Sequence, residues 1–195
     1  MLRVTMTLEH ASPKVAIVAT GYLGFLGTGY GYALGAAIAE PVRLIVNCHG
    51  DGSAGFHIQE LDTIARFGLK IMTVVFNNYV WGMSVNGQDL LYADKVKARP
   101  AIKLSRECKY EVVAEGFNCD GKKVTRLEEV SSVVSKLAKA GRPSLINLIV
   151  SAKPITPATM SMVGMTEDKN VIVVPYYDNV PRAYYKDGKQ TNGAA

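Results

Sequence analysis

The sequence predicts an α/β fold, a single domain of three layers in which a doubly wound parallel sheet carries helices on both faces. Two observations predict it. Short runs of apolar, β-branched residues recur through the first 150 positions, and segments with helical spacing alternate with them. Because the runs are continuously apolar, they are typical of strands buried on both faces of a parallel sheet. We expect residues 1–150 to form this domain and residues 151–195 to form an extended C-terminal arm with a disordered tip.

The chain opens with two expected strands joined by a loop and a helix. Residues 15–19 (VAIVA) are short, apolar and followed by glycine. A glycine-rich loop at 21–31 then leads into a small-residue helix at 32–39. Pro41 ends that helix, and the apolar residues 42–48 form the second buried strand.

A helix and a third strand follow. We expect a helix over residues 55–67, because its apolar residues fall on one face at helical spacing and Gly68 stops it. These apolar residues are Ile58, Leu61, Ile64 and Ala65. Residues 70–76 (KIMTVVF) form the third strand, which the turn-forming pair Asn77-Asn78 ends.

The rest of the domain continues the alternation. The expected elements are a helix near residues 105–116, a turn and an extended segment at 118–124, a helix at 125–140 and a last strand at 144–150. The helix at 125–140 is amphipathic, and Thr125 with Glu128 forms a capping-box pattern at its start. Its apolar side consists of Leu127, Val130, Val133, Val134 and Leu137.

Composition narrows the class of protein. With 195 residues, 48% hydrophobic and 20% charged, the chain can bury a sizeable core. The net charge is +5, but lysines and arginines are mixed with acids, which disfavours a nucleic-acid partner. No apolar run is long enough to cross a bilayer and no leader pattern is visible, so we expect a cytoplasmic protein without a membrane partner. Three scattered cysteines, Cys48, Cys108 and Cys119, predict reduced thiols.

The loops that follow the strands should carry the chemistry, because ligands bind at the carboxyl ends of strands in open α/β sheets. After the second strand, the stretch HGDGSA supplies the carboxylate of Asp51 and the free amides at the start of a helix, which favour anions. After the third strand, residues 77–81 supply amide oxygens and irregular backbone carbonyls. Carboxylate, amide, carbonyl and phosphate oxygens together suit magnesium. The residues therefore predict a magnesium diphosphate pocket.

The spacing of these motifs resembles the signature of thiamine diphosphate enzymes. Gly50-Asp51-Gly52 is followed by 24 residues and then by Asn77-Asn78, and the helix and strand expected between them fit the same pattern. The resemblance covers about residues 15–150 and is closest to the diphosphate-binding domain of the acetolactate synthase and pyruvate decarboxylase group. It implies the thiamine diphosphate-binding fold, with thiamine diphosphate and Mg²⁺ as cofactors.

The resemblance also implies roles for individual residues. Asp51, the side-chain amide of Asn78 and the carbonyl of Val80 would bind Mg²⁺. The expected cofactor-binding residues are Gly24, Leu26, Gly27, Gly50, Asp51, Gly52, Ser53, Ala54, Asn78, Trp81 and Met83.

Within this set, the implied contacts differ in kind. Leu26 would lie beneath the cofactor and hold it bent, while the amides of Ser53 and Ala54 would meet the diphosphate. Trp81 and Met83 would face the substrate channel, and simple packing is the alternative for both.

Other interpretations compete with this one. An isolated GDG is more often a turn than a binding site. The glycine loop could be a dinucleotide fingerprint, but Gly27-x-Gly29 is followed by Tyr32 where the third glycine belongs. His49 and His57 could act as proton donors, although a strand-end residue and a helix-surface residue are the favoured interpretations.

The resemblance implies an incomplete active site. In this family a different domain, usually in a partner subunit, supplies a glutamate beside the aminopyrimidine ring, and nothing in this chain resembles that domain, so the catalytic residue stays unknown. We expect the cofactor-binding half of a 2-oxo-acid decarboxylase or carboligase, a lyase or transferase. It would be active only with a pyrimidine-binding domain from a partner or from a missing N-terminal region, in a homo- or hetero-oligomer that acts on a small 2-oxo acid or similar acyl donor.

Two further hypotheses remain. The first is a non-catalytic cofactor-binding or regulatory module of the same fold. The second is a Rossmann nucleotide-binding domain, which would bind a nicotinamide dinucleotide instead.

Overall fold

The computed structural model describes residues 25–82, 84–85, 100–153, 164–165 and 172–173. The expected strand at 15–19, the site residues Gly24 and Met83, and most of the C-terminal arm lie outside the described residues. The chain divides into two compact units, Met1–Gly82 with Arg99–Ala152, and Met83–Ala98 with Lys153–Ala195. In the second unit, the two-residue strands β5 (Gly164–Met165) and β6 (Ile172–Val173) pair antiparallel.

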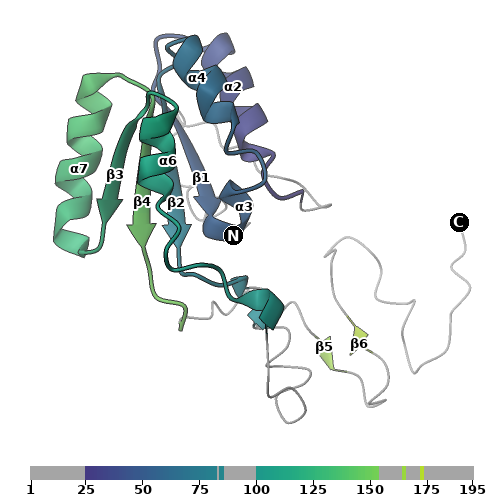
Figure 1. Ribbon diagram of the computed structural model, residues 1–195. Helices are drawn as coiled ribbons and strands as arrows, with labels where there is room; N and C mark the ends of the chain where they lie inside the picture. The colour runs from purple at the N-terminus through teal and green to yellow at the C-terminus, as the bar shows by residue number, and fades with distance from the viewer. Residues whose placement is uncertain (1–24, 83, 86–99, 154–163, 166–171, 174–195) are drawn as a thin grey trace, which may run out of the picture. The chain divides into compact units, whose positions relative to one another are not determined.

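The first unit is built on a four-stranded sheet in the order β1-β2-β4-β3 (Figure 1). Its strands are β1 (Ile45–Gly50), β2 (Ile71–Asn77), β3 (Asp120–Val124) and β4 (Ser144–Ile149). All three pairings are parallel. Parallel strands of this length need crossover connections, and helices supply them here.

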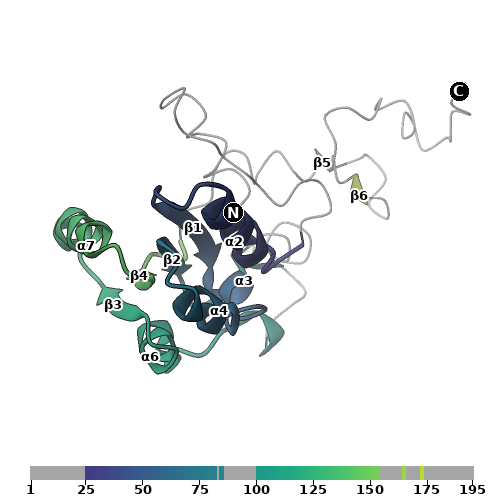
Figure 2. The same cartoon turned by 90° about the horizontal axis from the view of Figure 1, so that it is seen from above.

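Helices cover both faces of this sheet, as Figure 2 shows from above. The helices are α2 (Gly29–Ala39), α3 (Asp51–Ala54), α4 (Glu60–Arg66), α6 (Tyr110–Gly116) and α7 (Leu127–Ala140), and η1 (Pro100–Ile102) is a short 3₁₀ turn. Side chains of α2, α4 and α6 pack on one face, and those of α7 pack on the other. The predicted three-layer α/β architecture is therefore confirmed. Among the described residues, no helix is both long enough and apolar enough to span a bilayer.

Each face has its own apolar core. On the α2, α4 and α6 face, the core includes Tyr30, Leu61, Ile64, Val75 and Ala114, all buried. On the other face, Met72, Val124, Leu137 and Ile146 form a smaller cluster. The two clusters fix the sheet between its helices, because burial of apolar surface is the main favourable term in folding.

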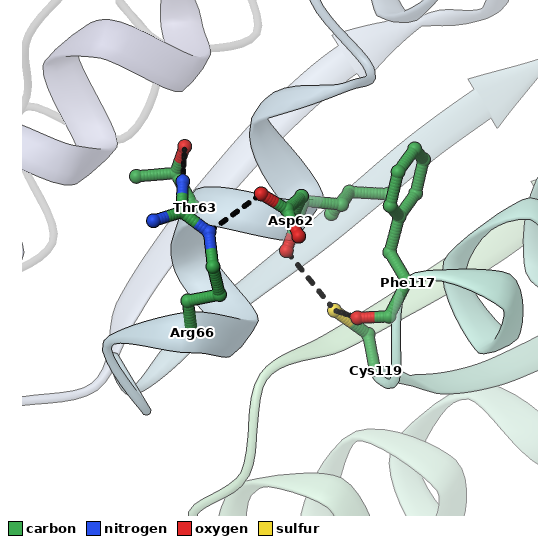
Figure 3. Close-up of polar contacts among 6 residues, drawn as sticks. Asp62, Thr63, Arg66, Phe117 and Cys119 are labelled. Carbon is green, nitrogen blue, oxygen red and sulfur yellow. Dashed lines mark hydrogen bonds and ion pairs between the residues drawn. The ribbon is translucent and has the colours of Figure 1, made fainter.

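Cys119 lies in the larger core, where α4 meets the end of α6 (Figure 3). Its thiol is 3.7 Å from the carbonyl oxygen of Leu61 and 3.9 Å from that of Phe117. Burial, with the nearby charge of Asp120 as a smaller cause, raises the pKa of this thiol to about 11. All three cysteines are free thiols, as the sequence predicts.

Several predicted helix bounds need correction. The helix expected over 55–67 is shorter: α4 covers Glu60–Arg66, and residues 55–59 form turns that separate it from the short helix α3 at 51–54. The chain already becomes helical at Asp51, directly behind β1. The longer helix, α4, therefore begins only at Glu60. Helix α2 likewise starts at Gly29, inside the expected glycine loop, and α6 starts only at Tyr110. Gly68 has φ +59° and follows α4 as predicted.

The capping box predicted for the helix at 125–140 is wrong. Helix α7 begins at Leu127 behind Arg126, and the side chain of this N-cap residue makes no capping hydrogen bond. Arg126 instead bonds Glu129 in the first turn, with Nε 3.0 Å from Oε1. Leu127, expected on the apolar side, is 83% exposed because it lies before the part of the helix that reaches the sheet.

Strand β1 is not buried on both faces within the described residues. Asn47 and His49 are buried under the α2 side, whereas Val46 is 54% exposed and Cys48 is exposed. The reason is that, among the described strands, α7 packs on β2, β4 and β3 and not on β1. The continuously buried strand expected at 42–48 is therefore a strand at 45–50 with one face covered by described residues.

Candidate functional site

The two halves of the GDG and NN pattern meet at one edge of the sheet. Strands β1 and β2 run parallel in a register that places Gly50 beside Phe76. The first residue of α3, Asp51, therefore lies beside the turn that follows Asn77. Asp51 is 4% exposed, so its carboxylate sits in the protein and not in bulk solvent.

Three backbone N–H groups donate to the carboxylate of Asp51. Its Oδ1 accepts from Gly52 at 2.9 Å, and its Oδ2 accepts from Asn78 at 3.2 Å and from Tyr79 at 2.6 Å. Burial raises the pKa of the Asp51 carboxyl, and these N–H donors offset part of the rise. A bound cation would favour the charged form further, because an opposite charge stabilises a buried carboxylate.

The turn after β2 presents oxygen atoms on an unusual backbone. Tyr79 adopts φ +61°, in the left-handed region that non-glycine residues rarely occupy. The side-chain oxygen of Asn78 accepts the N–H of Val80 at 3.1 Å. An antiparallel bridge to residues 102–104 uses the N–H of Trp81 and the carbonyl of Tyr79, so the carbonyl of Val80 takes part in neither bond.

The glycine loop is tied to α3 through Ser53. The N–H of Gly27 donates to Ser53 Oγ at 3.0 Å, and Gly27 has φ +89°. A side chain at this position would also meet Phe56 at 2.6 Å and His57 at 2.5 Å, so glycine is required here. Leu26, the residue before Gly27 in the loop, is 44% exposed and so presents apolar surface.

His49 is a buried support for this loop, a role that the sequence alone did not reveal. His49 is 2% exposed as a residue, and its ring stacks on Tyr30 with 4.5 Å between centroids and lies with Nδ1 3.1 Å from Ser53 Oγ. Burial, with a smaller effect of His57, lowers the pKa of His49 to about 4. His57 is exposed in the turn before α4 and not on a helix.

Trp81 packs directly on Gly52. A methyl group at Gly52 would lie 2.5 Å from the Trp81 ring, which also meets Phe56 edge-on with 6.1 Å between ring centroids. This contact favours the packing role for Trp81. It also makes the second glycine of the GDG motif a steric requirement of this chain.

Other residues support the site from a distance. The hydroxyl of Tyr110 on α6 donates to the carbonyl of Asp51 at 2.9 Å. Asn77, Asn147 and Glu111 form a buried chain of hydrogen bonds behind the turn. No sequence pattern predicts these contacts, because the partners lie between 36 and 70 positions apart. An open pocket of about 620 Å³ adjoins the loop and is lined by Gly27, Thr28, Gly31, Tyr32, Leu34, His57 and Glu60.

The donor set at this edge fits magnesium and a diphosphate. In the part of the chain that the structure describes, no three His, Cys, Asp or Glu side chains cluster in a way that could hold a metal. An ion here would therefore take one carboxylate, from Asp51, together with amide and carbonyl oxygens. Such a hard-oxygen set suits Mg²⁺ and leaves coordination positions for phosphate oxygens.

Comparison with known proteins agrees with this chemistry. The family model described as thiamine pyrophosphate enzyme, C-terminal TPP binding domain, matches residues 3–148. The acetolactate synthase large subunit IlvG of Mycobacterium tuberculosis is 30% identical over 138 residues, which cover 71% of this chain and 24% of that protein. The 2-hydroxyacyl-CoA lyase of Oryza sativa subsp. japonica is 33% identical over 148 residues, covering 73% of this chain and 25% of the relative. The chain thus spans about a quarter of the length of these curated relatives.

Proposed function

Because the chain belongs to the thiamine pyrophosphate enzymes, as a C-terminal cofactor-binding domain of the acetolactate-synthase-like group, we propose that it is the diphosphate- and magnesium-binding half of a 2-oxo-acid decarboxylase or carboligase. The cofactor pair of the family is thiamine diphosphate with Mg²⁺. When bound, the cofactor supplies a thiazolium ring that accepts the electron pair left by decarboxylation.

The observation that carries the proposal is the contact between the two motif halves. Asp51 Oδ2 accepts the N–H groups of Asn78 and Tyr79, so the carboxylate and the NN turn share one edge of the sheet. In the proposal, Asp51, the side chain of Asn78 and the carbonyl of Val80 hold Mg²⁺.

The glycine loop supplies the apolar part of the proposed site. Leu26 presents exposed apolar surface there, on which the cofactor would rest. The backbone amides of Ser53 and Ala54 bind the diphosphate oxygens. Ser53 Oγ meanwhile holds the loop through Gly27, so one residue serves both the anion and the loop.

The proposal includes a second domain. The chain spans about a quarter of its relatives' length, and the glutamate that activates the aminopyrimidine ring belongs to a pyrimidine-binding domain in this interpretation. The working enzyme is then an oligomer, or a longer polypeptide, that acts on a small 2-oxo acid.

An activity assay on a reconstituted pair tests this function. The chain is produced alone and with a polypeptide that carries a pyrimidine-binding domain of the same family, and CO₂ release from pyruvate is measured with thiamine diphosphate and Mg²⁺. We expect turnover only in the pair, and its loss in Asp51→Ala. Robust turnover by the chain alone, as a proven monomer, would contradict the half-site proposal. An assembled pair that binds cofactor without turnover would favour the non-catalytic module.

A further inference from the structure

A line of hydrogen bonds connects helix α6, through strands β4 and β2, to the turn that holds Asn78. Glu111 Oε2 accepts from Asn147 Nδ2 at 2.7 Å, and Asn147 Oδ1 accepts from Asn77 Nδ2 at 3.1 Å. Asn77 Oδ1 then accepts the N–H of Tyr79 at 3.2 Å. Asn77 and Asn147 are each 1% exposed, and Glu111 is half-buried.

The carboxylate of Glu111 sets the direction of the whole line. An ionised carboxylate only accepts hydrogen bonds, so Asn147 must turn its NH₂ group toward Glu111 and its oxygen toward Asn77. Asn77 must then donate to Asn147, which leaves its own oxygen for Tyr79. If both amides were reversed, the NH₂ of Asn77 would face the N–H of Tyr79, and two donors would oppose each other.

The end of the line is the strained part of the turn. Tyr79 has φ +61°, a left-handed backbone conformation that is unfavourable for a non-glycine residue. Its N–H is shared by Asn77 Oδ1 and Asp51 Oδ2, so both acceptors hold this conformation. The residues on either side of Tyr79 are Asn78 and Val80, the two non-carboxylate ligands of the proposed metal site.

We propose that Glu111 is a positioning residue for the magnesium site. It touches neither metal nor cofactor, but it fixes the orientation of the Asn147 and Asn77 amides and thereby the shape of the turn that presents Asn78 and Val80. The inference rests on the proposed function of that turn. It assigns a role to a helix residue that lies outside the GDG and NN motifs.

Substitutions at Glu111 separate hydrogen-bond direction from charge and packing. Glu111→Gln keeps an acceptor oxygen, Glu111→Ala removes it, and Glu111→Lys replaces it with a donor that favours the reversed line. Glu115→Lys is the matched control. Glu115 lies one turn later on α6 and is exposed, and its substitution by lysine changes the charge by the same amount outside the line of hydrogen bonds.

Two measurements are made on the full chain, with circular dichroism to verify folding. The first is hydrogen exchange of the Tyr79 amide without cofactor. The second is the Mg²⁺ dependence of thiamine diphosphate binding by calorimetry. We expect Glu111→Gln and Glu115→Lys to match the wild type. Glu111→Ala should exchange faster at Tyr79 and bind Mg²⁺ less tightly, and Glu111→Lys should lose roughly tenfold or more in Mg²⁺ affinity.

The outcomes distinguish this inference from the proposed function. Wild-type exchange at Tyr79 in both Glu111→Ala and Glu111→Lys would overturn the positioning role, whatever the chain binds. If Glu111→Lys does not fold, the comparison of Ala with Gln decides. A wild-type chain that binds no thiamine diphosphate would contradict the proposed function, while the exchange measurement would still test the line of hydrogen bonds.

Discussion

The carboxylate of Asp51 accepts the backbone N–H of Tyr79 at 2.6 Å, although the two residues are 28 positions apart in the chain. The contact exists because β1 and β2 are parallel neighbours whose carboxyl ends lie together. It places the carboxylate of one motif against the amide turn of the other. The protein scaffold therefore holds the proposed metal-binding groups near each other, which would lower the entropy cost of binding.

Substitution of Gly52 should displace the only tryptophan of the chain. In Gly52→Ala the added methyl group would lie 2.5 Å from the Trp81 ring, so the ring must move out of its half-buried position. Because Trp81 is the single tryptophan, its fluorescence emission reports the movement directly, and we expect a red shift. Overpacking of this kind should also reduce the free energy of unfolding by about 1–3 kcal/mol.

Gly55→Ala is the control for this prediction. A methyl group at Gly55 meets no atom within 4 Å, so its emission spectrum should match that of the wild type. If Gly52→Ala left both emission and stability unchanged, the Trp81 packing described here would be wrong.

Acid should destabilise the cofactor-free chain through His49. Burial, followed by the charge of His57, lowers the pKa of His49 from its ordinary value of 6.5 to about 4. Between these values the unfolded chain binds a proton that the folded chain does not, so stability rises with pH. The contribution is complete above pH 6.5 and is lost as pH falls toward 4. Urea unfolding at pH 7 and pH 5 should show a loss of roughly 2 kcal/mol from this group.

His49→Gln should remove this part of the acid sensitivity, since the variant has no imidazole to protonate. His57→Gln, a change at an exposed position, should keep nearly all of it. Equal acid losses in the wild type and in His49→Gln would show that His49 does not govern the stability of the chain in this pH range.

The close approach of α6 and β3 depends on Gly121. A methyl group there would collide with the backbone carbonyl of Glu111, which cannot move as a side-chain end can. We expect Gly121→Ala to lower the free energy of unfolding by about 1–3 kcal/mol. Gly116→Ala, where a methyl group meets nothing within 4 Å, should change it little. Thermal unfolding measures both, and equal midpoints would contradict the packing of this helix on the sheet.

Local patterns in the sequence predicted what depends on local chemistry. The apolar runs of β2 and β4 and the buried Leu61, Ile64 and Leu137 follow from burial, which a run of side chains encodes directly. The pairing of Asp51 with the NN turn followed from the rule that parallel strands end at one edge.

The predictions that the structure corrects also have physical causes. Thr125 and Glu128 match a capping box, but the chain turns into α7 two residues later, so the pattern did not fix the helix start. The helix expected at 55–67 starts only at Glu60, because the chain forms the short helix α3 directly behind the strand and then turns at 55–59. The contact between Asn77 and Asn147, 70 positions apart, depends on strand order, which side-chain periodicity does not contain.

Calorimetric titration of the chain with thiamine diphosphate, in Mg²⁺ and in EDTA, tests the central claim most directly. We predict binding in Mg²⁺ that weakens by roughly tenfold or more in EDTA, and the same loss in Asp51→Ala, because a charge-assisted contact of this kind contributes about 1.5–3 kcal/mol. Asp62→Ala, which removes an exposed carboxylate paired with Arg66, should bind as the wild type does. Affinity that is equal with and without Mg²⁺ and unchanged in Asp51→Ala would contradict the assignment of Asp51 as a magnesium ligand.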